Sequence, residues 1–250
     1  MKAFFTTIFF TPIFNLLVWL YTHVPGHDIG IAIIILTIIV RLILWPFQQS
    51  ALRSQKALQS LQPKLKTLQE QYKDDKAALN KATMELYAKD KVSPFSSCLP
   101  LLVQFPFLIA LYQVLRAGLA SADFNLLYHF VASPGSINPV SFGFLNLAAK
   151  SIPLAVIAGA AQFLQAKMLP MAPKATPPPG AGPGAKDEDQ LSKVNKQMLY
   201  IMPAFTVFIG ASLPAGLTLY WVATNLMAAL QQWLFLRDHK KKEAALTPAT

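Results

Sequence analysis

The sequence predicts an all-α integral membrane protein with five transmembrane helices, a cytoplasmic antiparallel helical hairpin and an N-terminal interfacial helix. Apolar residues make up 54% of the 250 residues and charged residues only 14%, whereas soluble domains average roughly 25% charged. The mean hydropathy of +0.40 excludes a water-soluble globular protein, and the high apolar content excludes a disordered chain. The apolar residues also gather into long blocks, and crossing a bilayer takes about 20 apolar residues in one helix.

Five of these blocks are expected to span the membrane, and the fourth is short. As a helix, Met198–Leu213 would extend roughly 24 Å, which is less than the hydrocarbon thickness of about 30 Å and predicts local thinning of the bilayer. Pro214, Ala215 and Gly216 are expected to form a tight turn between the last two blocks. The spans are predicted at 29–47, 99–117, 152–169, 197–213 and 215–236.

The positive charges assign an orientation to these spans. Of the 22 Lys and Arg residues, 17 lie in segments 48–98, 170–196 and 237–250, which share one side of the membrane if the spans alternate. Positive residues stay on the cytoplasmic side because moving them against the membrane potential is unfavourable. This predicts a multi-pass protein with a cytoplasmic C-terminus and an extracytoplasmic loop at 118–151. Because the charge lies between apolar blocks, direct DNA binding is not expected.

Residues 1–28 are expected to form an extracytoplasmic amphipathic, interfacial helix. The apolar block Phe4–Tyr21 contains Pro12, which would interrupt a helix near its midpoint. The alternative is a sixth span with Lys2 inside. Both arrangements bring Ile29 into the membrane from outside, so the topology downstream is the same.

Residues 48–98 are expected to fold as the cytoplasmic hairpin. Apolar residues recur with a period near 3.5 on both sides of a turn at Lys73-Asp74-Asp75, and Pro63 is expected to kink the first arm or to mark a helix start. The length of the segment favours a contact device over a solvated connector. The apolar seam consists of Leu58, Leu61, Leu65, Leu68, Tyr72, Leu79 and Leu86.

Two further cytoplasmic segments are expected to lack a core. Residues 170–196 alternate Pro with Gly and Ala, which is typical of a flexible linker. Residues 237–250 form a short basic tail, which suits contact with anionic lipid headgroups.

Arg41 is the only charge in the first predicted span, about 9 Å from its cytoplasmic end. Burying it costs a few kcal/mol, so it either snorkels to the cytoplasmic headgroups or faces a water-filled recess. Thr37 lies one helical turn earlier on the same face. Polar residues in other spans are often interhelical hydrogen-bonding groups, but together with Arg41 they favour a hydrophilic groove open to cytoplasm and lipid. They are Gln104, Gln162, Gln165, Thr218, Thr224 and Asn225.

The sequence carries no pattern for catalysis or for binding a metal or cofactor. All twelve carboxylates and four histidines lie outside the predicted spans, which argues against ion-coupled transport and histidine-assisted intramembrane hydrolysis. Cys98 is the single cysteine, and no HExxH or P-loop is present. No enzymatic activity and no cofactor are therefore expected.

A hydrated, positive recess is suited to holding the polar tail of a nascent membrane protein during insertion, because it shortens the low-dielectric path. Two other functions remain open from the residues alone. One is a small channel or facilitator with a polar pore, and the other is a structural assembly factor for membrane complexes.

Four separated stretches resemble the YidC/Oxa family of membrane protein insertases, in the family's order along the chain. The resemblance is to a short bacterial form without a large periplasmic domain, and Ser93, Ser96 and Ser97 depart from the Asn and Gly pair that the family often has there. The matching stretches are Ile33–Arg41 with Pro46, Leu61–Lys64 leading to Tyr72–Lys76, Cys98–Gln104 with Pro106, and Pro214–Trp221 with Asn225.

The resemblance implies a bacterial plasma-membrane protein whose groove residues contact the substrate and whose hairpin, residues 48–91, recruits partners. The implied partners are nascent membrane proteins and membrane lipids, with the ribosome, the signal recognition machinery and the Sec translocon as candidates for recruitment. It also implies that Phe14–Tyr21 lies on the outer surface. The residues expected in the groove are Arg41, Thr37, Gln104, Gln162, Gln165, Tyr220, Trp221 and Asn225.

Overall fold

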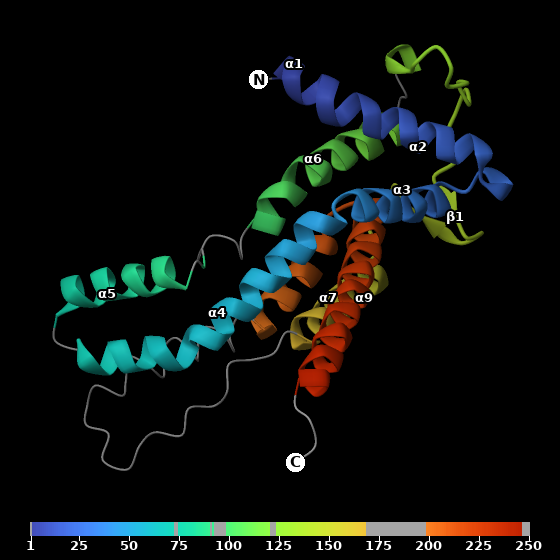
Figure 1. The fold of residues 1–250 in the computed structure, drawn as a ribbon. Coiled ribbons are helices and arrows are strands. Elements are labelled where there is room, and N and C mark those ends of the chain that lie inside the picture. Colours follow the sequence, from blue (N-terminus) through green and yellow to red (C-terminus); the bar gives the residue numbers. More distant parts are fainter. Residues whose placement is uncertain are drawn as a thin grey trace.

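The computed structural model is a helical bundle with a helical hairpin at one end and a small β-hairpin at the other (Figure 1). It describes residues 2–72, 75–90, 92, 99–120, 124–168 and 199–246, so the predicted linker 170–196 and the hairpin exit at 93–98 lie outside the described residues. A helix also covers Leu199–Gly210. The labelled elements are α1 (Lys2–Phe5), the π-helix η1 (Thr6–Phe10), α2 (Thr11–His23), the 3-10 helix η2 (Pro25–His27), α3 (Ile29–Ile43), α4 (Trp45–Gln71), α5 (Lys76–Lys89), α6 (Leu99–Ala120), the 3-10 helix η4 (Phe124–Leu126), β1 (Val140–Ser141), β2 (Leu145–Asn146), α7 (Ile152–Met168) and α9 (Ala215–Leu246).

The predicted helical architecture is confirmed, but the all-α class was incomplete because β1 and β2 form an antiparallel pair. The two strands lie in residues 124–151, which are called the outer loop below because this loop was predicted to be extracytoplasmic. Their connection needs positive φ at Phe142 (55°) and Gly143 (79°), and glycine adopts such values without steric cost. Each strand has only two residues, too short for an alternating hydrophobic pattern to reveal it.

Within the described residues, no single helix combines the length and apolar character needed for a membrane crossing. The helices α3 and α4 meet that test only as a pair, across a bend of 63°. Shorter apolar helices occupy Gln104–Leu115, Ile152–Met168 and Leu199–Gly210.

The first predicted span, 29–47, comprises parts of two helices. Helix α3 ends at Ile43, and α4 begins at Trp45 after the bend. Pro46 lies in the first turn of α4, where a missing backbone N–H costs no intrahelical hydrogen bond. The bend therefore lies just before a residue that is well accommodated at the start of a new helix.

The N-terminal segment stays helical past Pro12, where an interruption was expected. Pro12 occupies the first turn of α2, directly after the π-helix η1. In a continuous α-helix the proline ring would clash with the carbonyl of Ile8, four residues earlier. A π-helical stretch widens the helix at this point, so the chain continues with an altered hydrogen-bond register.

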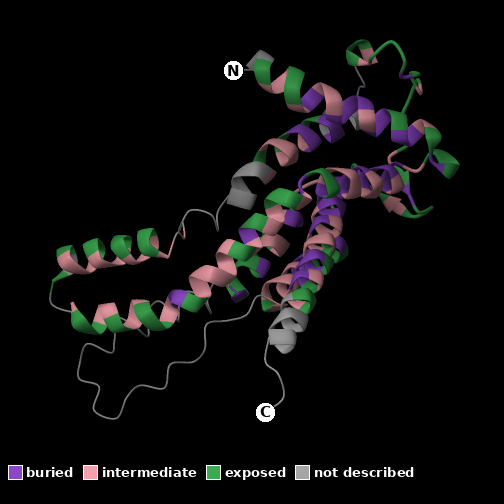
Figure 2. Cartoon of the chain, in the orientation of Figure 1, coloured by how far each residue is buried: buried purple, intermediate pink, exposed green. Residues whose placement is uncertain are grey.

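The buried core lies where α2, α3, α6, α7 and α9 meet (Figure 2). Helix α9 packs along both α7 and α3, and α2 packs on α3 and α6. The buried side chains of α2 and α3 include Phe14, Leu17, Ile29 and Ile33, each no more than 2% exposed. The hairpin contributes little to this core, since most of its residues are half-buried or exposed (Figure 2).

The turn before α9 differs from the prediction at Pro214-Ala215-Gly216. The preceding helix ends at Gly210, and α9 already begins at Ala215. The carbonyl of Pro214 accepts the backbone N–H of Leu217 at 3.0 Å, so this proline initiates the helix. The same helix runs to Leu246, which places much of the predicted basic tail in helical conformation.

The outer loop is fastened to α2 by two polar side chains. The amide of the buried Asn15 donates to the carbonyl of Leu126 at 3.0 Å and accepts the backbone N–H of Tyr128 at 2.6 Å. The Tyr21 hydroxyl accepts the backbone N–H of Asn138 at 3.0 Å. These bonds satisfy loop backbone groups and join α2 and the outer loop into one layer.

Asp28 fastens the outer loop to α3 and caps that helix. Its carboxylate accepts the N–H groups of Gly30 and Ile31, at 2.8 and 3.1 Å, and that of Phe142 at 2.6 Å. It also accepts the hydroxyl of Ser141. Burial opposes ionisation, but the hydrogen bonds from Ser141, Phe142, Ile31 and Gly30 outweigh it and hold the pKa of Asp28 below its ordinary value of 3.8.

The Asp28 carboxylate should therefore stabilise the fold at every pH above 3.8, and this contribution should be lost as the pH falls through 3.8 toward the lower folded-state pKa. We expect Asp28→Ala to lower the free energy of unfolding by about 0.5–2 kcal/mol from the lost cap alone. Thermal unfolding in detergent, followed from neutral to acidic pH, measures both effects. The exposed Asp238→Ala serves as the control, and an unchanged acid dependence in Asp28→Ala would contradict this role.

A second stability prediction concerns the close approach of α7 to the helix at Leu199–Gly210. A Cβ atom built at Gly159 would lie 2.4 Å from Cγ2 of Val207 and 2.9 Å from the carbonyl oxygen of Pro203. We expect Gly159→Ala to cost about 1–3 kcal/mol, because the backbone carbonyl has no rotamer to escape into. The exposed neighbour Ala160→Ser is the matched control. Equal melting temperatures for the two variants would show that the helices can separate freely.

Candidate functional site

Arg41 lies in the last turn of α3, and protein encloses its side chain. Only 9% of the residue is exposed, and its Nη1 group donates to Oε1 of Gln48 in α4. Its Nε atom is buried without a hydrogen-bond partner among the described residues. The one ion pair between described side chains lies elsewhere, in the hairpin. The guanidinium, which has five N–H donors, is therefore paired with a neutral amide and keeps donors for a further acceptor.

Tyr220 and Gln104 bring two more helices to this region. Tyr220 of α9 is 4% exposed, and its hydroxyl accepts a hydrogen bond from Nε2 of Gln104 in α6. Tyr220 and Arg41 are close enough to interact electrostatically. Three of the predicted groove residues thus come together from α3, α6 and α9.

Thr37 and Trp221 flank this cluster without a described polar link to it. Thr37 is 1% exposed, and its hydroxyl donates to the carbonyl of Ile33 in its own helix at 2.7 Å. Trp221 is half-buried and packs against the hydrophobic core. Thr37 contributes a satisfied hydroxyl, and Trp221 contributes an aromatic surface beside Tyr220.

The remaining predicted residues lie along α7 and its neighbours. Gln162 accepts a hydrogen bond from the Thr206 hydroxyl, and Asn225 donates to the carbonyl of Ala158 at 3.4 Å. Within the described residues these two bonds join α7 to adjacent helices and do not reach Arg41 or Tyr220. Gln165 is half-buried, about one turn beyond Gln162 on α7.

Three glutamines that pair with the α3–α4 region or are deeply buried were absent from the predicted set. Gln48 is the hydrogen-bond partner of Arg41, and Gln231 of α9 donates to the carbonyl of Trp45 at 3.2 Å. Gln231 and Gln232 are each 2% exposed. Both lie inside the fifth predicted span, so the argument applied to Gln162 would have found them. Gln48 carried no such signal, because it follows the end of the first predicted span.

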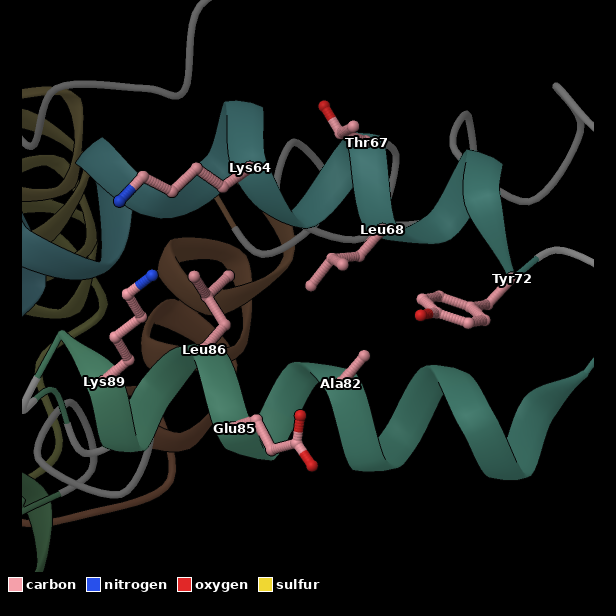
Figure 3. A pocket seen from close by; sticks show the side chains of 8 residues that line it. All are labelled: Lys64, Thr67, Leu68, Tyr72, Ala82, Glu85, Leu86 and Lys89. Atoms are coloured by element: carbon pink, nitrogen blue, oxygen red, sulfur yellow. The ribbon is translucent and has the colours of Figure 1, made fainter.

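The hairpin forms the second predicted site region. Leu68 and Tyr72 of α4 face Ala82 and Leu86 of α5 (Figure 3). A pocket of about 440 Å³ opens between the two helices. It is lined by Lys64, Thr67, Leu68, Tyr72, Ala82, Glu85, Leu86 and Lys89.

Local contacts account for the shape of the hairpin. Asp75 caps α5 by accepting the N–H groups of Ala77 and Ala78, at 3.0 and 2.9 Å, and Lys64 pairs with Asp90 at 3.0 Å. Pro63 was expected either to kink the first arm or to mark a helix start. It lies inside α4, so it does not mark a helix start. Of the seam residues, Leu61 is buried, and the half-buried ones are Leu58, Leu65, Leu68, Tyr72, Leu79 and Leu86.

The described residues contain no group of His, Cys, Asp and Glu that could hold a metal ion. The polar region around Arg41 consists of a guanidinium, amides and a phenol. These groups can bind and orient a passing polar group by hydrogen bonds and charge.

Comparison with known proteins relates this arrangement to a family. The model of the 60Kd inner membrane protein family matches residues 19–243. The membrane protein insertase YidC of Fusobacterium nucleatum is 35% identical over 210 residues, covering 84% of this chain and 87% of the relative. The insertases YidC of Francisella tularensis subsp. novicida and of subsp. tularensis are both 35% identical over 244 residues, covering 96% of this chain.

The chain spans 37% of the length of those two Francisella relatives. The family match nevertheless includes Arg41, the hairpin and nearly all of α9. This chain belongs to the 60Kd inner membrane protein family, also called the YidC/Oxa family, whose relatives compared here are membrane protein insertases.

Proposed function

We propose that this protein inserts nascent membrane proteins into the bacterial plasma membrane and helps them fold. The observation that carries the proposal is Arg41, which is enclosed by protein and bonded to the neutral Gln48, and whose Nε atom has no hydrogen-bond partner in the part of the chain that the structure describes. Such a cation can receive an acidic or polar group that enters the membrane region. The relatives, each named a membrane protein insertase, support the same function and give no support to a small channel.

The proposed orientation places the hairpin and the C-terminus in the cytoplasm and the outer loop outside. The distribution of Lys and Arg supports it, because 17 of the 22 lie in segments that share one side. Helix α3 then enters from outside at Asp28, and Arg41 lies toward the cytoplasmic end. The N-terminal helices, fastened to the outer loop through Asn15 and Tyr21, belong to the outer surface.

In the proposed mechanism, the protein around Arg41 opens into a hydrophilic groove that faces the cytoplasm and lipid and receives the polar tail preceding a substrate helix. Arg41 attracts acidic groups on that tail, and the pull is strong where the effective dielectric constant is low. Tyr220 and Trp221 guide the apolar part of the substrate toward lipid. Exposed apolar side chains on neighbouring helices, such as Val156 and Phe208 at 51% and 73%, are suited to meet lipid tails.

Gln48 is proposed to position Arg41 without neutralising it. An amide oxygen orients a guanidinium by a hydrogen bond but leaves its full positive charge for a substrate, whereas a carboxylate would compete with an acidic tail. Placing Gln48 after the bend holds the guanidinium against α4. Arg41 thereby supplies the charge, and Gln48 sets the orientation of the guanidinium.

The hairpin is proposed to recruit the machinery that delivers substrates, with the ribosome, the signal recognition machinery and the Sec translocon as candidates. Its pocket combines the apolar Leu68, Ala82 and Leu86 with the exposed Lys64 and Lys89. Such a surface suits a partner that presents apolar and acidic groups together.

We expect Arg41→Ala to slow the insertion of single-span substrates with acidic tails by about 10- to 150-fold, since a hydrogen bond to a charged group contributes about 1.5–3 kcal/mol. Protease protection of the translocated tail in proteoliposomes measures insertion. The control is Arg53→Ala, which removes an exposed arginine of α4. Equal insertion by the two variants would contradict the proposed role of Arg41, and substrates with neutral tails should be affected much less.

The role of Gln48 predicts a separation of stability from activity. We expect Gln48→Glu to keep the melting temperature in detergent at or above that of the wild type, because the carboxylate gives the already buried Arg41 guanidinium a charged partner. The same change should slow insertion of acidic-tailed substrates as much as Arg41→Ala. Gln49→Glu adds the same charge one residue later and should insert normally. Insertion by Gln48→Glu at the rate of Gln49→Glu would show that the free charge is not used.

A further inference from the structure

The outer loop exposes several aromatic side chains in fixed positions. Phe130 and Phe144 are 67% and 81% exposed, and Phe142 and Tyr128 are about two-fifths exposed. Phe142 and Phe144 flank Gly143 at the tip of the β-hairpin. Large apolar groups that an ordered loop holds exposed indicate a binding surface.

The outer loop has a buried interior of its own, so a lack of packing does not explain why these aromatic side chains are exposed. The same loop buries Val131, Ile137 and Leu147, which are at most 8% exposed. Hydrogen bonds to Asn15, Tyr21 and Asp28 hold the loop backbone in place. The loop therefore folds with one set of apolar residues inward and a second set held outward.

The composition of the outer loop indicates which environment covers its exposed aromatic side chains. Between Asp123 and Lys150 the chain has no Asp, Glu, Lys or Arg. A loop that faces water, or that binds a charged partner surface, usually carries charges, whereas uncharged segments with aromatic side chains suit the boundary between lipid headgroups and acyl chains.

The connection of the outer loop to α2 also indicates that lipid covers the exposed aromatic side chains. Helix α2 and the outer loop form one layer, and α2 also exposes Trp19, at 41%. Since α2 is proposed to lie on the outer membrane surface, the loop hydrogen-bonded to it lies at the same level. Trp is a typical residue of that interface.

We propose that the aromatic tip of the outer loop, residues 142–144, and the separately exposed Phe130 insert into the outer leaflet of the lipid bilayer. The inference rests on the orientation given under the proposed function. The inserted tip anchors the outer end of the bundle, because Phe142 is bonded to Asp28 at the start of α3 and Leu147 accepts the N–H of Gly216 in α9. It thereby holds both helices at a fixed depth relative to the lipid.

Single spin labels test the proposal in the full-length protein. In a Cys98→Ser background, Phe144→Cys and Phe130→Cys carry the label, and Ser136→Cys, an exposed polar position of the same loop, is the control. The protein is reconstituted in vesicles of phosphatidylethanolamine and phosphatidylglycerol. Collisions with oxygen, which concentrates in lipid, are compared with collisions with a water-soluble nickel chelate.

The expected result is an oxygen-to-nickel collision ratio several-fold higher at positions 144 and 130 than at position 136. The high exposure of Phe144 means that its replacement leaves the packed core intact. A ratio at 144 equal to that at 136 would overturn the inference, including the case in which the tip contacts a protein partner instead of lipid.

A membrane-impermeant maleimide separates this failure from a failure of the orientation. Ser136→Cys in intact cells should react without permeabilisation if the loop is outside. Reaction from outside combined with a water-exposed label at 144 would overturn the lipid insertion alone. Reaction only after permeabilisation would overturn the orientation and the insertion together.

Discussion

The physical constraint on which this structure depends is the burial of one guanidinium within an apolar helical bundle. Arg41 has no carboxylate partner among the described residues and is held by the amide of Gln48. That contact exists because the chain bends by 63° between α3 and α4. Helices α6 and α9 add Gln104 and Tyr220, which are hydrogen-bonded to each other, and Tyr220 interacts electrostatically with the charge. A buried cation held by neutral groups costs stability, and this cost is acceptable where the charge serves a substrate.

The end of the bundle that is proposed to face outward shows the complementary arrangement, in which three described polar groups are paired. Asp28 accepts four hydrogen bonds, Asn15 binds two backbone groups of the outer loop, and Ala215 at the start of α9 donates to the carbonyl of Ala149. Close helix approach at Gly159 adds rigidity near the middle of α7. The molecule thus combines a tightly bonded outer end with an incompletely paired charge nearer the proposed cytoplasmic side.

The helices were predictable because their signals are local. Block length, periodicity and proline positions predict most of the ends of α3, α6, α7 and α9 to within several residues. The bend at Leu44, the π-helix before Pro12 and the β-hairpin were not predicted, because they depend on bend geometry and on contacts such as Asp28 with Phe142. For the site, Arg41 was predicted from its residue type and position in the span, and Tyr220 was predicted from the family resemblance alone. Gln48 was missed because only the bend brings it to Arg41.

The most direct test of the central claim is photo-crosslinking from position 41 to a ribosome-stalled nascent membrane protein. A photoreactive amino acid at Arg41 should form adducts with the polar tail of the stalled substrate. The same probe at Val156, an exposed apolar position of α7, should give adducts mainly with lipid. Substrate adducts from position 41 would support a niche that passing chains enter. Adducts with lipid alone from both positions would contradict it.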